Sequence, residues 1–448
     1  MTYTAGFSPT GLIREALSKK SDRALSALET RTGHSWKMAL DRAHIILEPK
    51  DMPAALNLFI RTAAGARITD LDGNAFIDLS MGHGAQVLGH NHAAVRGAVL
   101  AQAERGWDYG LPGADHVELA RLIQAASPAN ERVLLCNSGE DALKSAVRSA
   151  QAFAGIADIS SDSDDATPLG DLLARTAPEA AAALAAHRGR LAAIVIEPVR
   201  AALPTLAHGD WLGDVMKAAQ DAGILVIFNE VHTGFRLAFG GAQELLGAIP
   251  DLTVYGRAVG GGLPLGAVAG RADVMATCGP NDSGEFPGNP ISTAAGVATL
   301  KELQQQRAHL YPMLNDAGRK LADDFNAVCA AEHLPVAMHA VGSMFRIVFD
   351  PAMYSAETAF YLFALSRSVF INTSRIGFLS AAHRSADLDY VASALAESLR
   401  DVRDDGLFTA DPARAGSMEG RVGGRAAQLM PLPPLRRGDI RRGEMSEL

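Results

Sequence analysis

Alternating apolar and polar positions divide the chain into short strand-like and helix-like segments. Apolar runs at 191–199 (LAAIVIEPV) and 224–231 (ILVIFNEV) have the length of buried strands, with the amphipathic stretch WLGDVMKAAQDAG between them. Two more short apolar runs follow at 252–256 and 267–271. Strands that alternate with helices are typical of a mostly parallel sheet covered on both faces. The pattern therefore predicts an α/β fold.

Other patterns refine this picture. Residues 66–79 alternate around Asp72-Gly73, which predicts a β-hairpin. The stretch RVLLCNSGEDALKSAVRSAQAFAG predicts a buried strand, a Ser-Gly turn and an amphipathic helix. Residues 292–306 and 313–332 have helical patterns, and 333–404 mix strands with helices. We expect a second, smaller α+β domain there.

Shifts in composition suggest the domain boundaries. We expect an N-terminal arm with part of the small domain at 1–65, a large α/β domain at 66–305 and a small α+β domain at 306–405. Residues 406–448 are rich in Pro, Gly and Arg and predict a tail. The acidic, Ser-rich stretch 156–168 predicts a surface loop of unassigned role.

Charge and cysteine content limit the expected partners and compartment. The net charge of −9 over 448 residues argues against nucleic acid as the main partner. Three widely spaced cysteines suggest neither a disulfide framework nor a zinc cluster, which fits a cytoplasmic protein. No apolar run approaches the roughly 18 residues of a membrane span, so we expect no membrane association.

Several spaced motifs together resemble one enzyme family. They are GARITDLDGNAFIDL, LLCNSGEDALKSAVRSAQAFAG, IVIEPV with ILVIFNEVHTGFR, PDLTVYGRAVGGGLPLGAVAGR and GEFPGNPISTAAGVATL. Over roughly 40–400 the chain resembles class III aminotransferases of fold type I, and among them glutamate-1-semialdehyde aminomutases. The resemblance implies a large α/β domain, a smaller domain and a homodimer with sites at the subunit interface. It also implies pyridoxal 5′-phosphate (PLP) as the family's cofactor.

The residues that hold PLP in that family differ in this chain. Arg257 stands where the family has its Schiff-base lysine, and a guanidinium cannot form that bond. Asn229 replaces the carboxylate that pairs with the ring nitrogen. Glu140 and Glu285 replace two phosphate-binding threonines, and the segment with the ring-stacking aromatic residue is missing.

These departures lead to a definite expectation. Two carboxylates beside a phosphate would repel it by several kcal/mol, more than the helix dipole offsets. We therefore expect no cofactor, and a PLP-independent enzyme that acts on a small amine or amino-acid-like substrate in a bacterial biosynthetic pathway. The candidate catalytic residues are Glu140, Glu285, Arg257 and His232, and the candidate substrate-binding residues are Asn229, Ser138, Gly139, His83 and Glu197.

Other interpretations stay open. Glu140 lies four residues before Lys144, so it is also a candidate for an ordinary helix ion pair. Arg257 with Glu140 and a partner-derived Glu285 would form a charge cluster that either binds substrate or only fills a cavity. Glu140, Glu285 and His232 could also bind a divalent metal, as a weaker alternative. The remaining alternatives for the whole chain are a non-catalytic partner subunit and an atypical PLP-dependent aminotransferase or aminomutase.

Overall fold

The computed structural model describes residues 19–34, 58–161, 169, 175–205, 209–279, 283, 285–349, 353–372 and 375–408. The predicted tail lies outside these residues from 409 onward, as does most of the predicted acidic loop, 162–168. The chain forms two compact units. Of the described residues, unit 1 contains those up to 93, 201–205 and those from 312 to 408; unit 2 contains those of 94–200 and 206–311.

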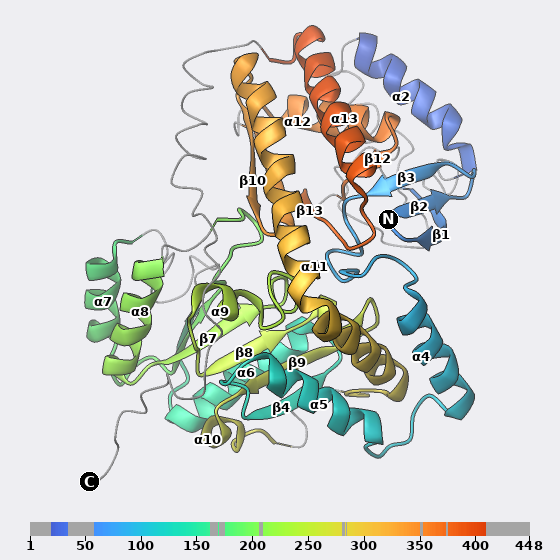
Figure 1. The fold of residues 1–448 in the computed structure, drawn as a ribbon. Coiled ribbons are helices and arrows are strands. Elements are labelled where there is room, and N and C mark those ends of the chain that lie inside the picture. Colours follow the sequence, from blue (N-terminus) through green and yellow to red (C-terminus); the bar gives the residue numbers. More distant parts are fainter. Residues whose placement is uncertain are drawn as a thin grey trace, which may run out of the picture. The chain divides into compact units, whose positions relative to one another are not determined.

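Unit 2 is built on a six-stranded sheet with the strand order β4-β9-β8-β7-β6-β5 (Figure 1). Its strands are β4 (Arg132–Cys136), β5 (Ile159–Ser161), β6 (Ala193–Ile196), β7 (Leu225–Glu230), β8 (Leu252–Tyr255) and β9 (Gly266–Gly270). Strands β5 to β8 are parallel, and β9 runs antiparallel to both β8 and β4. The C-terminal ends of β4, β6, β7 and β8 therefore meet at one edge. The predicted α/β architecture is confirmed.

Alternate residues of the central strands face opposite sides of this sheet. Ile194 and Val226 belong to a core cluster shared with the adjacent helices α7 (Ala177–Ala186) and α8 (Gly209–Ala222) (Figure 1). Val195 and Ile227 belong to a second cluster, shared with α6 (Gly139–Ala154). Because both faces are covered, the central strands β6, β7 and β8 are mostly apolar, which is the signal that the sequence carries.

The other helical elements of unit 2 are α4 (Ala93–Arg105), α5 (Ala114–Ala126), α9 (Gly241–Leu246), the 3₁₀ turn η4 (Arg257–Gly260) and α10 (Ala272–Met275). The prediction of separate helices at 292–306 and 313–332 is wrong, because α11 (Pro290–Ala331) is continuous through Pro312. Leu310, Tyr311 and Leu314 are buried, so packing holds the helix together around the proline. No described helix is long and apolar enough to cross a membrane.

Unit 1 contains two smaller sheets. One has the order β1-β2-β3-β12 and the other β10-β11-β13. The strands are β1 (Ile60–Ala64), β2 (Arg67–Asp70), β3 (Ala75–Asp78), β10 (Val336–Val341), β11 (Met344–Phe349), β12 (Val369–Phe370) and β13 (Ile376–Phe378). The described helices besides α11 are α2 (Lys19–Arg31), α12 (Tyr354–Ser366) and α13 (Ser385–Asp404). Leu25, Phe76 and Leu362 bring α2, β3 and α12 into one core cluster.

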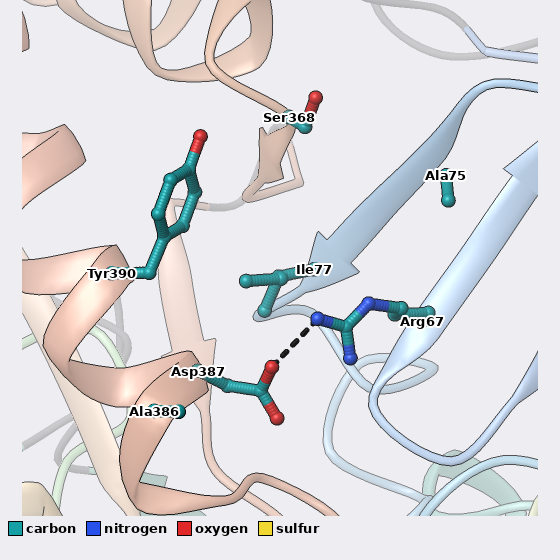
Figure 2. A pocket seen from close by; sticks show the side chains of 7 residues that line it. All are labelled: Arg67, Ala75, Ile77, Ser368, Ala386, Asp387 and Tyr390. Carbon is teal, nitrogen blue, oxygen red and sulfur yellow. Dashed lines mark hydrogen bonds and ion pairs between the residues drawn. The ribbon is translucent and has the colours of Figure 1, made fainter.

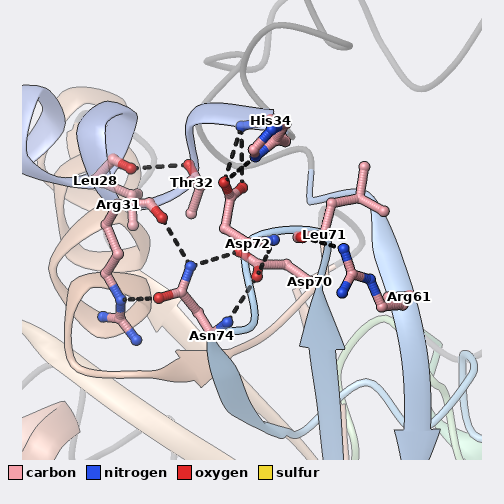
Figure 3. A network of polar contacts seen from close by, with 9 residues as sticks. All are labelled: Leu28, Arg31, Thr32, His34, Arg61, Asp70, Leu71, Asp72 and Asn74. Atoms are coloured by element: carbon pink, nitrogen blue, oxygen red, sulfur yellow. Dashed lines mark hydrogen bonds and ion pairs between the residues drawn. The ribbon is translucent and has the colours of Figure 1, made fainter.

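The predicted hairpin is confirmed as β2 and β3. The buried Asp70 carboxylate accepts hydrogen bonds from the backbone N–H groups of Asp72 and Asn74, at 3.0 and 2.8 Å, which shapes the turn (Figure 3). The Asn74 amide also donates to the carbonyl of Arg31, at 2.8 Å, and so ties α2 to the hairpin. The hairpin groups with unit 1 and not with the large sheet, because β3 pairs in parallel with β12.

Candidate functional site

The C-terminal ends of four parallel strands form the candidate site in unit 2. Ser138 and Gly139 follow β4, Glu197 follows β6, Asn229 lies near the end of β7, and Arg257 follows β8 by two residues. Ligands of open α/β sheets bind beyond the carboxyl ends of the strands. The sheet therefore gathers these predicted site residues at the edge where a ligand is expected.

Glycines allow the backbone to approach closely at this edge. A β-carbon added at Gly256 would lie 3.0 Å from the Cα atom of Gly139, and one at Gly139 would lie 2.7 Å from the Val231 side chain. A β-carbon at Gly266 would lie 2.1 Å from the carbonyl oxygen of Ser138. The turn after β4 is thus packed directly against the ends of β7 and β8, so that a small ligand would meet all three segments.

The same turn begins helix α6. The Ser138 hydroxyl accepts a hydrogen bond from the backbone N–H of Asp141 at 3.1 Å, so Ser138 is the N-cap. The N–H groups of the first helical turn and the helix dipole favour an anion at this position. In this respect the residues fit the phosphate of a cofactor.

Glu140 points away from the charge cluster that the sequence suggested. Its carboxylate pairs with Lys144 at 2.6 Å across one helical turn, and the Glu140 side chain is 76% exposed. The hydrogen bond to Glu140 raises the pKa of Lys144. Because its charge is paired and in solvent, Glu140 repels an anion at the helix N-terminus far less than the sequence argument assumed.

Arg257 is the long side chain at the end of β8. It begins η4 with a left-handed φ of 47° and is partly buried, and burial lowers its pKa. Burial, with a further contribution from the charge of Arg257, lowers the pKa of the fully buried Arg236 to about 9, against an opposing effect of Tyr311. The charges of the two guanidinium groups therefore influence each other at this end of the sheet.

Asn229 and Glu197 come together as neighbours on adjacent strands. The Asn229 amide donates to the Glu197 carboxylate at 3.3 Å, and its oxygen accepts from the backbone N–H of Val231 at 3.3 Å. His232 follows directly and is half-buried. The polar groups beside the end of β7 are therefore an amide, a carboxylate and an imidazole.

The two other predicted site residues are Glu285, beside the turn after β4, and His83, in unit 1. Glu285 is exposed in the turn before α11, and its carbonyl accepts a hydrogen bond from the Asn137 side chain. Its predicted entry into a partner's cavity stays a prediction. His83 belongs to unit 1, where it has a left-handed φ of 54° and its Nδ1 lies 2.9 Å from the Asn372 amide.

Sequence reasoning missed a buried polar network directly beneath the site. Glu230, the last residue of β7, is completely buried, and its carboxylate accepts hydrogen bonds from the Thr233 hydroxyl at 2.9 Å and from Ala242 N–H at 2.6 Å. It also accepts from the backbone and the side-chain amide of Gln243, at 3.0 and 3.2 Å. Burial outweighs these hydrogen bonds and raises the pKa of Glu230 to about 7.

Tyr255 connects this network to the end of β8. It stands opposite Glu230 in the parallel pairing of β7 with β8, and its hydroxyl accepts from Gln243 at 3.0 Å and from Asn130 at 2.9 Å. Burial, and then the charge of Glu230, raises the pKa of Tyr255, which keeps the phenol protonated. The signal that could have revealed the network is the pairing of two strands that each end in a polar residue.

A separate pocket lies in unit 1, between the hairpin sheet and α13. Figure 2 shows its lining residues, among which Arg67 and Asp387 form an ion pair at 2.7 Å. None of the predicted site residues lines it. Among the described residues, no group of three or more His, Cys, Asp and Glu side chains gathers in a way that would hold a metal ion.

The architecture and the strand-end site define a class of protein, the α/β enzymes of PLP-dependent fold type I. The sequence profile of class III aminotransferases matches residues 49–158 and 156–374. The chain belongs to the class III aminotransferase family, which confirms the family predicted from the sequence.

Named relatives and solved structures agree with this assignment. Glutamate-1-semialdehyde 2,1-aminomutase of Methanoregula boonei is 35% identical over 378 residues, covering 74% of this chain and 90% of the relative. A structure of a transaminase with PLP bound has a TM-score of 0.71 at 25% identity, covering 84% and 99% of the two chains. A lysine-to-alanine variant of the aminomutase from Pseudomonas aeruginosa PAO1, in complex with PMP, has a TM-score of 0.75 at 20% identity, covering 87% and 99%.

These findings overturn two predictions. The expectation of no cofactor and the expectation of a PLP-independent enzyme are both wrong, because the relatives are aminomutases and the similar structures hold PLP or PMP. The error has a physical origin at Glu140. The sequence argument counted its charge against a phosphate, whereas the structure pairs that charge with Lys144. Of the interpretations that the sequence left open, we retain that of a PLP-dependent aminotransferase or aminomutase.

Proposed function

We propose that this chain is an enzyme that binds PLP or its amine form, PMP, at the strand ends of unit 2 and acts on a small amine or amino-acid-like substrate. The observation that carries the proposal is the close packing of the α6 N-terminus against the ends of β7 and β8. The aminomutase relatives, which align with about three quarters of this chain, support the same kind of substrate.

The phosphate would lie at the α6 N-terminus, against Ser138 and Gly139. The N-cap geometry of Ser138 and the absence of a side chain at Gly139 support this position. The ring would lie toward Asn229, whose amide is already fixed by Glu197 at 3.3 Å. A neutral amide can hydrogen-bond to the ring nitrogen but does not keep it protonated as a carboxylate would.

When bound, the cofactor supplies an electron-accepting ring that stabilises negative charge on the carbon beside an amine. The chain's own residues would orient the ligand and move protons. Glu197 would hold Asn229 in place, His232 is the candidate for proton transfer, and Arg257 would donate hydrogen bonds in the position of the missing Schiff-base lysine. Glu140 stays a candidate catalytic residue at the exposed edge of the site.

The enzyme is also proposed to be a cytoplasmic homodimer. The most exposed large apolar side chains among the described residues of unit 2 are Trp107 at 69%, Leu111 at 76% and Phe286 at 65%. Exposed apolar side chains of this size favour burial against another protein surface. Phe286 adjoins Glu285, so an interface there would bring Glu285 to a subunit boundary.

A titration tests the proposed function. The full chain is titrated with PLP, with PMP and with pyridoxal, which lacks the phosphate, and binding is followed by calorimetry. We expect saturable binding of PLP and a clear loss of affinity for pyridoxal, because the α6 N-terminus holds the phosphate. Failure of both PLP and PMP to bind at millimolar concentration would contradict the proposal.

A further inference from the structure

The lysines of unit 2 bear on how a cofactor is held. Unit 2 has three lysines among its described residues, and each amine is paired with a carboxylate on a helix. Lys144 pairs with Glu140 at 2.6 Å, Lys217 with Asp221 at 3.4 Å, and Lys301 with Glu118 at 2.9 Å. The described strand ends therefore present no lysine amine, and the side chain that they present after β8 is a guanidinium.

We propose that this chain holds its cofactor by non-covalent contacts alone, so that the cofactor enters and leaves as an exchangeable ligand. The inference rests on the proposed function, since it concerns the same site. Arginine stays protonated at ordinary pH and has no lone pair to attack an aldehyde. Retention of the cofactor then depends on the phosphate contacts at α6 and on hydrogen bonds from Arg257.

The local backbone supports a role for Arg257 as a contact to the ligand. It is the first residue of η4, directly after Gly256, and Gly256 is packed against Gly139 at the α6 N-terminus. A small molecule with its phosphate at that helix would therefore lie beside residue 257. The left-handed φ of 47° fixes the direction in which the Arg257 side chain leaves the backbone.

The charge of Arg257 also distinguishes between the two forms of the cofactor. A guanidinium only donates hydrogen bonds, and the aldehyde oxygen of PLP accepts them. The aminomethyl group of PMP is a cation, which Arg257 and the nearby Arg236 would repel. We therefore expect PLP to bind about tenfold more tightly than PMP, given charge repulsion over a few ångströms in a partly buried site.

Borohydride trapping tests the inference without any assay of activity. The full chain is loaded with PLP, treated with borohydride, and analysed by intact mass and peptide mapping, with a parallel sample dialysed to follow loss of the cofactor. We expect bound PLP, no covalent adduct, and complete loss on dialysis. The Arg257→Lys variant restores an amine at the same backbone position, so we expect it to form an adduct at residue 257.

The controls separate the possible failures. An adduct on the wild-type chain at the stoichiometry of binding would overturn the inference while leaving the proposed function intact. If that adduct disappeared in Lys144→Arg, which keeps the charge beside Glu140, a displaced lysine would be identified as its site. If neither the wild-type chain nor Arg257→Lys bound PLP or PMP, the proposed function would fail, and this inference with it. Equal or tighter binding of PMP would overturn the role of Arg257.

Discussion

Two layers of unit 2 lie one above the other and differ sharply. The lower layer is the buried network of Glu230, Gln243 and Tyr255, in which every carboxylate oxygen of Glu230 accepts hydrogen bonds. The upper layer is the strand-end site, where Asn229 and Arg257 stand at positions at which the family resemblance expects a carboxylate and a lysine. Asn229 directly precedes Glu230 on β7, and Arg257 follows Tyr255, the last residue of β8, by two residues.

The difference teaches that the scaffold and the chemistry of this site are separable. The lower layer is buried, and its side chains hydrogen-bond to one another, so removing one of them leaves a buried polar group unsatisfied. The upper layer is partly exposed and is the proposed ligand site, so we expect a substitution there to change which ligand is held and how, at little cost in stability. The following changes test whether the two layers are in fact independent, from the largest expected effect to the smallest.

Glu230→Ala should have the largest effect on stability. It removes the acceptor of the hydrogen bonds from Thr233, Ala242 and Gln243 and leaves those donors buried. We expect a loss of about 3–5 kcal/mol in the free energy of unfolding, measured by urea denaturation. A loss below about 1 kcal/mol would show that the lower layer does not support the site as described.

The pH dependence of stability should carry the signature of Glu230. Its pKa rises from 4.5 in the unfolded chain to about 7 in the folded one, so the folded state binds more protons between these values. The stability that Glu230 contributes is therefore complete below pH 4.5 and falls by about 3 kcal/mol as the pH rises through 7. Unfolding curves at intervals from about pH 5 to 8 measure this decline. It should be absent in Glu230→Gln; an unchanged decline there would assign it to another group.

Ser138→Ala should affect both stability and ligand binding moderately. Loss of the N-cap hydrogen bond to Asp141 should lower the free energy of unfolding by about 1 kcal/mol, and the affinity for PLP should fall as well. The matched control is Ser393→Ala on α13, where the hydroxyl donates only to the Asp389 carbonyl. That control should stay within about 0.5 kcal/mol of the wild type and bind PLP normally. Equal behaviour of the two variants would remove Ser138 from the site.

The smallest effect is expected at the exposed pair of Glu140 and Lys144. Glu140→Gln should leave the urea midpoint unchanged and alter the dissociation constant for PLP by less than about threefold, because Lys144 already offsets the carboxylate. Lys144→Gln should weaken PLP binding more than Glu140→Gln does, since it leaves the carboxylate unpaired at the helix N-terminus. A large gain in affinity for Glu140→Gln would restore the argument that Glu140 repels a phosphate.

Much of the fold could be predicted because the signals are local. Strand β6 is an uninterrupted apolar run and β7 begins with one, and the hairpin turn has the Asp-Gly pair that such turns favour. The continuity of α11 could not be predicted in the same way, because a proline normally ends a helix and only the burial of Tyr311 and Leu314 around it shows why this one continues.

The site was harder to predict because its electrostatics depend on pairing. The sequence located the strand ends and named Asn229, Arg257 and Ser138, but it could not show that the Glu140 charge is turned to Lys144. It also missed Glu230, since the partners of the buried carboxylate come from the turn after β7 and from α9, and α9 becomes a neighbour only in the folded chain. The prediction of no cofactor failed because the sequence does not show the pairing of Glu140 with Lys144.

The most direct test of the account is a crystal structure of the full chain grown with PLP. We predict electron density for the cofactor at the ends of β4, β7 and β8, with its phosphate against the α6 N-terminus at Ser138 and Gly139. The density of the ring should end before the Arg257 side chain, with no bond to any lysine. A ring covalently joined to a lysine, or strand ends without cofactor at saturating PLP, would contradict it.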